Sequence, residues 1–565
     1  MKMSGGQMIC EAISAEGVKT IFGYPGGAIM NVYDEMYKQD KFEHILTRHE
    51  QAAVHAADGY ARASGKVGVA MVTSGPGFTN AVTGIATAYT DSIPLVVISG
   101  QVPLALIGTD GFQEIDAVGI SRSCTKHNFL VRSLEELPRV LKEAFYIARS
   151  GRPGPVLVDV PKDITGEIGE FVYPKEVHLP TYKPNYKGND RQIKKAVQAI
   201  LEAKKPLLYI GGGAVLSGAT DIIRELASVT QMPVVETLMA RGVMGAKNPL
   251  LLGMLGMHGN YSSNMAMSET DLIISLGARF DDRVTGKLSE FAKYADIIHV
   301  DIDPANIAKL VDVDYPIVGD IKTVVEKMIP LLKDDVKTER YKVWRDILAR
   351  YDELHPLLYN DNDEVIKPQW AIERLGELVG EQAIITSDVG QHQMWAAQFY
   401  PFDRPNQWIN SGGLGTMGFG FPAALGAKKA IPEKTVINIT GDGSILMNVQ
   451  ELVTASENNI PVINVVLNNH FLGMVRQWQT FFYEKRYSET DLSYQPNWKM
   501  LAEACAGIGY DVTSKEEFDA AIKDAIKQDK VAFVNVIVAR LENVLPMVPS
   551  GGALYNMLLE SKEEK

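Results

Sequence analysis

The amino-acid sequence predicts an α/β protein with three doubly wound parallel-sheet domains, of which the first and third are copies of one unit. This prediction depends on the chain length, on the alternation of strand-like and helix-like segments, and on an internal repeat. At 565 residues the chain exceeds the roughly 250–300 residues that one hydrophobic core can serve, so several domains are expected.

Short runs rich in β-branched residues recur along the chain, and stretches with helical spacing separate them. This alternation is typical of parallel sheets in doubly wound α/β domains. The predicted strands are residues 67–73, 94–99, 156–160, 207–210, 272–276, 297–302, 436–440 and 462–467.

Two polar, irregular stretches divide the chain. Residues 173–189 contain Pro174, Pro180 and Pro184, and residues 360–368 form the second stretch. Such stretches are typical of linkers between domains. We therefore expect a first domain at residues 1–172, a central α/β domain at 190–335, a third domain at 366–548 and a C-terminal tail at 549–565.

An internal repeat links the first and third domains. A shift of 367 positions lays residues 50–97 on residues 417–464 without a gap. Identities are few, but both segments show a helix, a strand ending in Thr, a glycine turn, a second helix, and an Ile-Pro pair that begins the next strand. This shared order indicates two copies of one α/β unit. The copies differ where chemistry is expected, because Glu50 faces Met417 and the turn at 74–77 faces the turn at 441–444.

The composition narrows the function classes. Hydrophobic residues make up 46% of the chain and charged residues 22%, which is ordinary for a globular protein. The net charge of −13 would repel a phosphate backbone, so nucleic acid is not an expected partner. The three cysteines form no C-x-x-C pair, as expected in a reducing compartment. No apolar run approaches the about 18 residues of a membrane span and the N-terminus lacks a targeting signal, so we expect a cytoplasmic protein without a membrane partner.

The turn at residues 441–444 has the sequence Gly-Asp-Gly-Ser and follows a predicted strand. Glycines there let backbone N–H groups approach a phosphate, and the helix that follows adds a favourable dipole. Asp442 and Asn469 supply hard oxygen donors at adjacent strand ends, which suits a magnesium ion bridging phosphate oxygens. An isolated Gly-Asp-Gly is more often an ordinary turn, but the Asn-Asn pair at 468–469 favours a diphosphate held through a metal.

Glu50 begins a predicted helix in the sequence Arg-His-Glu-Gln-Ala-Ala at residues 48–53. Taken alone, Glu50 is better interpreted as a helix N-terminal residue stabilised by the helix dipole.

The sequence resembles the thiamine-diphosphate-dependent enzymes over nearly its whole length, from Gly-Tyr-Pro-Gly-Gly at residues 23–27 to Pro-Met-Val-Pro at 546–549. Within this family, five stretches resemble the catalytic large subunits of acetolactate (acetohydroxyacid) synthases rather than pyruvate decarboxylase or pyruvate oxidase. They are residues 108–114, 123–128, 253–259, 279–286 and 473–479. One departure is Gly111, where the family usually has alanine, and we expect it to loosen the loop carrying Phe112 and Gln113.

The resemblance implies thiamine diphosphate, Mg²⁺ and FAD as cofactors. It implies that the two copies of the repeated unit bind thiamine diphosphate, the first domain at the pyrimidine and the third at the diphosphate and Mg²⁺. The Mg²⁺ ligands would be Asp442, Asn469 and the carbonyl group of Phe471. Glu50 would hydrogen-bond the aminopyrimidine ring nitrogen and so favour the imino tautomer that removes the thiazolium proton.

Further site residues follow from the same resemblance. Met417 would support the V conformation of the cofactor. The other implied catalytic residues are Gly27, Gln113 and Lys162. The remaining implied thiamine-diphosphate contacts are Pro25, Thr73, Asn80, Val389, Gly390, Gln391, His392, Gly415, Gly441, Gly443, Ser444, Gly473 and Met474.

The FAD site is implied by the resemblance alone. The Gly-Gly-Gly run at residues 211–213 follows a predicted strand but lacks the full G-x-G-x-x-G spacing, and by itself it is at least as often a tight turn. In this family the flavin has no net redox duty. The implied FAD contacts are Arg152, Gly211, Gly212, Thr237, Met257, His258, Gly277, Arg279, Arg283, Asp301, Ile302 and Asp320.

The implied reaction is decarboxylation of pyruvate and addition of the resulting carbanion to a second 2-oxo acid. Pyruvate as acceptor gives 2-acetolactate, and 2-oxobutyrate gives 2-aceto-2-hydroxybutyrate, both in branched-chain amino-acid biosynthesis. The implied substrate contacts are Phe112, Arg283, Met474, Val475 and Trp478. Without the resemblance, Arg283 would be interpreted as a solvated ion pair and Trp478, as a Trp after a helix, as part of the core.

Glu50 and the metal residues lie on different copies, and the family builds its sites between chains. We therefore expect a homodimer or homotetramer, together with a separate small regulatory subunit. Two alternatives are a thiamine/FAD oxidoreductase of the pyruvate oxidase kind and a homologue that binds partners without catalysis. The stretch at residues 279–286 and Trp478 count against the first, and the retained Glu50, Asp442 and Asn469 count against the second.

Overall fold

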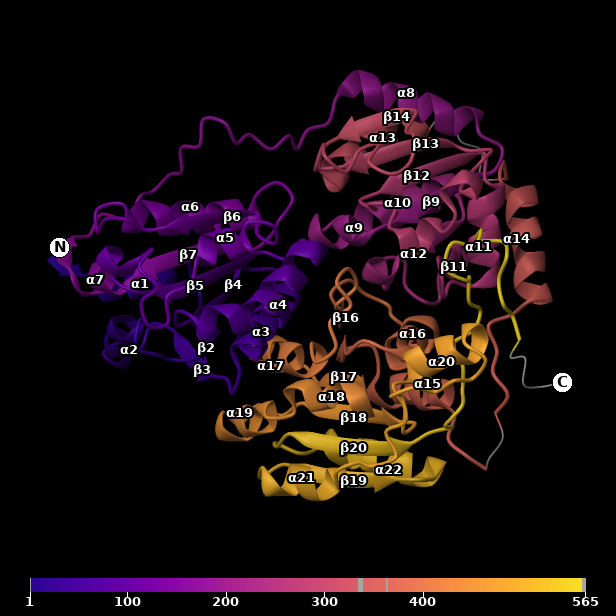
Figure 1. The fold of residues 1–565 in the computed structure, drawn as a ribbon. Helices are drawn as coiled ribbons and strands as arrows, with labels where there is room; N and C mark the ends of the chain where they lie inside the picture. Colours follow the sequence, from indigo (N-terminus) through magenta and orange to yellow (C-terminus); the bar gives the residue numbers. More distant parts are fainter. Residues whose placement is uncertain (1, 334–338, 362–363, 561–565) are drawn as a thin grey trace.

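The computed structural model describes residues 2–333, 339–361 and 364–560. Within these ranges the chain forms three six-stranded parallel sheets flanked by helices, and Figure 1 shows them as three separate bodies. The predicted fold class is therefore confirmed. The predicted end of the central domain at residue 335, residues 362–363 of the second linker and residues 561–565 of the tail lie outside the described ranges.

The first sheet has the strand order β3-β2-β4-β5-β7-β6. Its strands are β2 (Thr20–Gly23), β3 (Glu43–Leu46), β4 (Gly68–Val72), β5 (Leu95–Gln101), β6 (His127–Leu130) and β7 (Val156–Pro161). Helices α3 (Glu50–Ser64), α4 (Pro76–Asp91) and α5 (Ala117–Ser121) cover the face toward the third domain. Helices α1 (Gly5–Ala15), α2 (Met30–Tyr37), α6 (Leu137–Arg149) and α7 (Lys162–Gly166) cover the other. Strands β1 (Lys2–Ser4) and β8 (Ile168–Glu170) form a small antiparallel pair.

The third sheet repeats this order position for position, as β16-β15-β17-β18-β20-β19. Its strands are β15 (Ile384–Ser387), β16 (Trp408–Asn410), β17 (Val436–Gly441), β18 (Ile463–Asn468), β19 (Ile508–Val512) and β20 (Ala532–Ile537). Its helices are α15 (Pro368–Val379), α16 (Gln391–Phe399), α17 (Gly420–Ala430), α18 (Asp442–Ile445), α19 (Glu451–Glu457), α20 (Gly473–Phe482), α21 (Trp498–Ala504) and α22 (Lys515–Ala525). Because the repeat aligns β4 with β17 and β5 with β18, the predicted internal repeat is confirmed.

The middle sheet has the order β11-β10-β9-β12-β13-β14. All its strands are parallel, but the order in which successive strands are added reverses between β9 and β12. Its strands are β9 (Pro206–Ile210), β10 (Val234–Glu236), β11 (Leu251–Met254), β12 (Leu272–Leu276), β13 (Asp296–Asp301) and β14 (Tyr315–Val318). Its helices are α8 (Asp190–Glu202), α9 (Gly212–Leu216), α10 (Thr220–Thr230), α11 (Tyr261–Glu269), α12 (Asp282–Thr285), α13 (Ile321–Leu332) and α14 (Lys342–Leu354). Helix α14 packs against α11 and lies beyond the predicted range 190–335.

Four short 3-10 helices complete the described elements, at η1 (Leu104–Leu106), η2 (Leu238–Ala240), η3 (Leu288–Glu290) and η4 (Leu446–Asn448). Residues 171–189 contain neither helix nor strand and run from the first domain to α8 (Figure 1). After β20 the chain returns to the middle domain, where the Val548 N–H donates to the Met257 carbonyl at 2.8 Å and Leu554 is buried in the core.

Helices α3 and α17 cross at the centre of the interface between the first and third domains. A Cβ atom on Gly59 would lie 2.1 Å from the carbonyl oxygen of Ala423, and one on Gly426 would lie 1.8 Å from that of Ala56. The repeat pairs Gly59 with Gly426 and Ala56 with Ala423, so the contact is reciprocal. The later glycine of each helix meets the earlier alanine of the other, so the two helices run antiparallel.

This crossing predicts that Gly59→Ala destabilises the protein. In an open helix position alanine stabilises by about 1 kcal/mol relative to glycine. Here the added methyl group meets backbone that no rotamer change can move, and overpacking typically costs about 1–3 kcal/mol or more. Gly426→Ala should act in the same direction. The check is the apparent midpoint of thermal unfolding, and a midpoint equal to or above that of the wild type in either variant would contradict the crossing.

Candidate functional site

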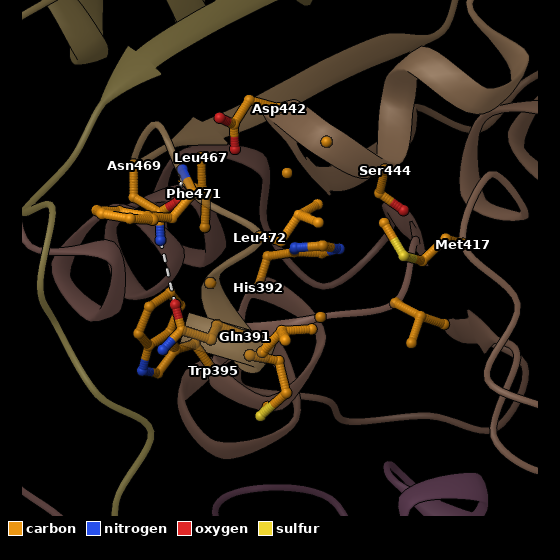
Figure 2. Close-up of a pocket in the computed structure, with 17 residues that line it drawn as sticks. Gln391, His392, Trp395, Met417, Asp442, Ser444, Leu467, Asn469, Phe471 and Leu472 are labelled. Carbon is orange, nitrogen blue, oxygen red and sulfur yellow. Dashed lines mark hydrogen bonds between the residues drawn. The ribbon is translucent and has the colours of Figure 1, made fainter. Parts of the chain in front are cut away.

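A pocket opens at the carboxyl ends of β15, β17 and β18 in the third domain, and Figure 2 shows its lining. The residues are Val389, Gly390, Gln391, His392, Trp395, Met417, Gly441, Asp442, Gly443, Ser444, Leu467, Asn469, Phe471, Leu472, Gly473, Met474 and Val475. This set contains every third-domain residue predicted for thiamine diphosphate or metal except Gly415. The structure therefore brings these predicted residues together around one cavity.

The three predicted metal ligands lie at neighbouring strand ends. Gly441 of β17 pairs with Leu467 of β18, so Asp442 and Asn469 leave the sheet side by side. Burial raises the pKa of Asp442 to about 7, and Gln495 donates a hydrogen bond to its Oδ2. Asn469 Oδ1 accepts the Phe471 N–H at 3.1 Å and has a second lone pair for another partner.

This donor set fits a hard cation. The described ranges contain no group of three or more His, Cys, Asp or Glu side chains that could hold a metal, so a cation at Asp442 would also need amide and backbone oxygens. Such oxygens suit Mg²⁺, which keeps several waters and bridges phosphates. A cation would also supply the countercharge that the buried Asp442 carboxylate lacks.

Three of the predicted cofactor residues carry a buried polar atom without a hydrogen-bond partner in the described chain. They are Nε2 of His392 in the third domain, Oγ1 of Thr73 in the first and Oγ1 of Thr237 in the middle domain. Buried polar groups are normally paired, so an unpaired one calls for an explanation such as a ligand. Burial lowers the pKa of His392 to about 3, so its ring is neutral, and Figure 2 places it inside the pocket beside Leu472.

Gln391 joins three elements around the pocket. Its Oε1 accepts from Asn469 Nδ2 at 3.1 Å, the bond drawn in Figure 2. Its Nε2 donates to Gln477 Oε1 at 2.8 Å and to the Glu542 carbonyl at 3.0 Å. Gln477, Gln495 and Glu542 were not predicted as site residues, because isolated amides and a backbone carbonyl leave no signal in a sequence.

Helix α20 forms a side of the pocket through Met474 and Val475, and 52% of Val475 is exposed. Trp478 lies one turn further along α20, inside the helix. Its ring is half-buried at 5.5 Å from the ring of Phe482 and does not line the pocket of the single chain.

The first domain gathers a second group of predicted residues at the end of β4. Glu50 begins α3, and its Oε2 accepts from Asn80 Nδ2 at 2.9 Å. A Cβ atom on Gly77 would lie 2.7 Å from the methyl group of Thr73 and 3.5 Å from Glu50 Oε1. The structure thus brings Glu50, Thr73 and Asn80 together.

Gln113 belongs to the same group, because its Cα would lie 3.0 Å from a Cβ atom on Gly75 in the turn at residues 74–77. The neighbouring Phe112 side chain is 89% exposed.

Pro25 and Gly27 follow β2, where a Cβ atom on the intervening Gly26 would overlap Thr73. Lys162 begins α7 with an exposed side chain, and its carbonyl group accepts from Asn31 Nδ2 at 3.1 Å. Of these three positions, the turn at residues 25–27 contacts the first-domain group through Gly26 and Thr73.

The two groups do not meet within one chain. No described residue of the first domain lines the pocket. In the antiparallel pair, Glu50 at the start of α3 lies beyond the C-terminal end of α17, whereas Met417 precedes its start. The 11 residues of α17 span about 16 Å, so Glu50 and Met417 are separated by at least that distance along the axis of α17.

The predicted FAD residues lie at the carboxyl edge of the middle sheet. Gly211 follows β9, Thr237 follows β10, and Gly277 follows β12. A Cβ atom on Gly211 would lie 2.3 Å from the Gly277 carbonyl oxygen, so the two backbones touch where the strand order reverses. Such switch points are the usual binding crevices of doubly wound sheets.

Further predicted FAD residues continue along this edge. Asp301 ends β13, where burial raises its pKa to about 6, and Ile302 follows it. Asp320 follows β14 and caps α13 by accepting the Thr323 N–H at 3.0 Å. Arg152 donates to Asp303 at 3.2 Å and so joins the first domain to this edge.

The remaining predicted FAD residues follow β11 and β12. His258 and Met257 follow β11, and burial lowers the pKa of His258 to about 4. Arg279 donates to the Thr90 carbonyl at 3.2 Å, which joins the middle domain to α4. The Arg283 side chain is 59% exposed and 3.9 Å from Asp282, as expected of a solvated ion pair.

Comparison with known proteins gives matches along the whole chain. Residues 3–120 match the N-terminal TPP binding domain of thiamine pyrophosphate enzymes, residues 193–328 the central domain, and residues 388–536 the C-terminal TPP binding domain. No helix of the described chain is long and apolar enough to cross a membrane.

Three individual relatives are each 48% identical to this chain over nearly its whole length. The large subunit of acetolactate synthase isozyme 3 from Escherichia coli (strain K12) is 48% identical, and the match covers 99% of both chains. The acetolactate synthase large subunit of Haemophilus influenzae is 48% identical over 100% of this chain and 99% of its own. The probable acetolactate synthase large subunit of Methanocaldococcus jannaschii is 48% identical over 98% of this chain and 95% of its own. The chain therefore belongs to the thiamine pyrophosphate enzymes and, among them, to the acetolactate synthase large subunits.

Proposed function

We propose that the chain catalyses the decarboxylating condensation of pyruvate with a second 2-oxo acid to form 2-acetolactate or 2-aceto-2-hydroxybutyrate. The observation that carries this proposal is the third-domain pocket, where the Gly-Asp-Gly-Ser turn and Asn469 lie on neighbouring strand ends. The names of the relatives support the reaction.

Three cofactors are part of this proposal, and the residues present support each of them. Asp442, Asn469 and the Phe471 carbonyl would hold Mg²⁺, and the unpaired His392 Nε2 and the glycines at 441 and 443 suit a diphosphate. Thiamine diphosphate, when bound, supplies a carbon that adds to a 2-oxo acid and takes up the electron pair released with carbon dioxide. The edge of the middle sheet, with unpaired Thr237 Oγ1, would hold FAD.

The chain's own residues would then have separate roles in proton transfer and in substrate binding. Glu50, fixed by Asn80, holds a proton at the aminopyrimidine ring nitrogen. Gln113, Lys162 and Gly27 border the substrate from the same domain, with the exposed Phe112 beside them. These residues orient the substrate and exclude water, while Met474, Val475 and Trp478 with Arg283 form the side where the second 2-oxo acid binds.

A complete site would need two chains. Glu50 and Met417 lie at opposite ends of the α3–α17 pair, so the missing wall of each pocket must come from another copy. We therefore propose a homodimer or a pair of dimers. Because the relatives are named large subunits, we also propose a separate small regulatory subunit.

The reaction is tested by supplying the purified protein with thiamine diphosphate, Mg²⁺, FAD and a mixture of pyruvate and 2-oxobutyrate in air. We expect the two acetohydroxy acids as products, whereas acetate or peroxide would instead indicate a pyruvate oxidase.

Trp478→Leu should lower the preference for 2-oxobutyrate by roughly tenfold or more, within the about 1–3 kcal/mol that one methylene can carry. An unchanged product ratio with a collapsed rate would leave Trp478 a packing residue.

We expect Glu50→Gln to retain thiamine diphosphate and to slow proton exchange at the thiazolium carbon by at least about 10²-fold, as is typical when a proton-transfer group is lost. Exchange in deuterated buffer, followed by NMR, is the measurement. Unchanged exchange would remove Glu50 from this role.

We expect Asp442→Ala to abolish tight binding of Mg²⁺ and thiamine diphosphate, because the cation would lose its only carboxylate ligand. The matched change Asp190→Ala, at an exposed carboxylate of the middle domain that binds Lys327, should leave the affinity unchanged. In the wild type, affinity should weaken as pH falls below about 7, since a proton then competes for Asp442. Titration calorimetry measures both effects, and wild-type affinity in Asp442→Ala would show that the metal lies elsewhere.

A further inference from the structure

The carboxylate of Glu451 binds the backbone of the other copy of the repeated unit. Glu451 begins α19 in the third domain and is fully buried. Its Oε1 and Oε2 accept the backbone N–H of Arg48 in the first domain at 2.9 and 3.2 Å. Its Oε2 also accepts the hydroxyl group of Thr454 at 2.6 Å. All of these partners are neutral.

The first-domain residues that Glu451 binds form the turn leading into Glu50. The Thr454 hydroxyl also lies 3.3 Å from the carbonyl oxygen of Leu46 and shares its one proton between that oxygen and Glu451, so the third domain contacts both ends of residues 46–48. The turn then enters α3, where His49 is the N-cap and Glu50 the first helical residue. Only His49 lies between Arg48, whose N–H group is held, and Glu50.

Burying the Glu451 side chain at this position costs free energy. Burial disfavours an ionised carboxylate unless it is hydrogen-bonded or paired. The guanidinium group of Arg48 ion-pairs instead with the exposed Glu457, at 2.6 Å. A hydrophobic side chain would fill the volume without that cost, but it could not accept the Arg48 N–H. The carboxylate is therefore best explained by the turn that it holds.

The opposite loop is held in the same way from the first domain. Asp91 at the end of α4 accepts the backbone N–H groups of Gly412 and Gly413 at 3.1 and 2.7 Å. Those glycines begin the loop that carries Met417. Each copy thus uses a buried carboxylate to hold a loop of the other copy. The held loop precedes α3 or α17 and leads to the site residue Glu50 or Met417.

We propose that Glu451 is a positioning residue that fixes the Glu50 carboxylate for proton transfer to the cofactor. The inference rests on the function proposed above for Glu50. Proton transfer needs its groups within hydrogen-bond reach, and a displacement of about 1 Å can cost about 10²-fold in rate. A turn released at Arg48 would let the first turn of α3 shift or fray.

The test compares Glu451→Leu with Glu451→Gln, measuring proton exchange at the thiazolium carbon of bound thiamine diphosphate. Leucine removes both oxygens, so exchange should slow by about tenfold or more. Glutamine keeps one oxygen opposite the Arg48 N–H and should restore most of the rate. The matched control Glu457→Leu removes the ion pair to the Arg48 side chain and should leave exchange unchanged. Affinity for Mg²⁺ and thiamine diphosphate should not change, because Glu451 does not line the pocket.

A double variant separates positioning from general damage. If Glu451 acts only through Glu50, adding Glu451→Leu to Glu50→Gln should slow exchange no further than Glu50→Gln alone. Additive losses, or full exchange in Glu451→Leu while Glu50→Gln is slow, would overturn the positioning role and leave that of Glu50 intact. Full exchange in Glu50→Gln would instead overturn the proposed role of Glu50. Should Glu451→Leu not fold, Thr454→Val removes the hydroxyl that joins Glu451 to Leu46, and full exchange in that variant would equally count against the proposal.

Discussion

Two glycines, Gly59 and Gly426, allow helices α3 and α17 to touch backbone to backbone, and the relative position of the first and third domains depends on that contact. Protein interiors are packed as densely as organic crystals, so a single added methyl group must displace something. The residue one turn before each glycine, Ala56 in α3 and Ala423 in α17, is also small, which keeps the crossing close. Because the helices are short and stiff, their crossing point also fixes where their ends lie, and the site residues lie at those ends.

A buried cluster of charges secures the end of this helix pair where the three domains meet. Arg62 at the end of α3 binds Asp58 and Asp91, and it donates to the Asn410 carbonyl of the third domain at 2.9 Å. Removing one partner from such a group typically costs about 3–5 kcal/mol, because a buried charge is left without compensation. Arg279 of the middle domain reaches Thr90, the neighbour of Asp91. The cluster thus couples the geometry of all three domains to the loop that carries Met417.

Local sequence pattern predicted eight strands inside the three sheets, because each is buried on both faces and is therefore a continuous apolar run, but it did not name the strands at the sheet edges. Residues 272–276 and 436–440, for example, correspond to β12 and β17. Motif spacing predicted Asp442 and Asn469, since the strands they follow are neighbours in the repeat. Gln495 and Glu451 could not be found in this way, because their role comes from contacts across 53 and 403 positions of sequence.

The antiparallel crossing has a consequence for assembly. Each chain carries a first-domain group around Glu50 and a third-domain pocket around Met417, and the crossing keeps them at least about 16 Å apart. In the proposed dimer, a two-fold axis would bring the first-domain group of each chain to the pocket of the other, so that two copies form two complete sites and leave no half unmatched. A head-to-tail arrangement of two chains would complete only one site and expose the remaining halves. Closed two-fold symmetry is therefore the smallest assembly that uses every site residue of the chain.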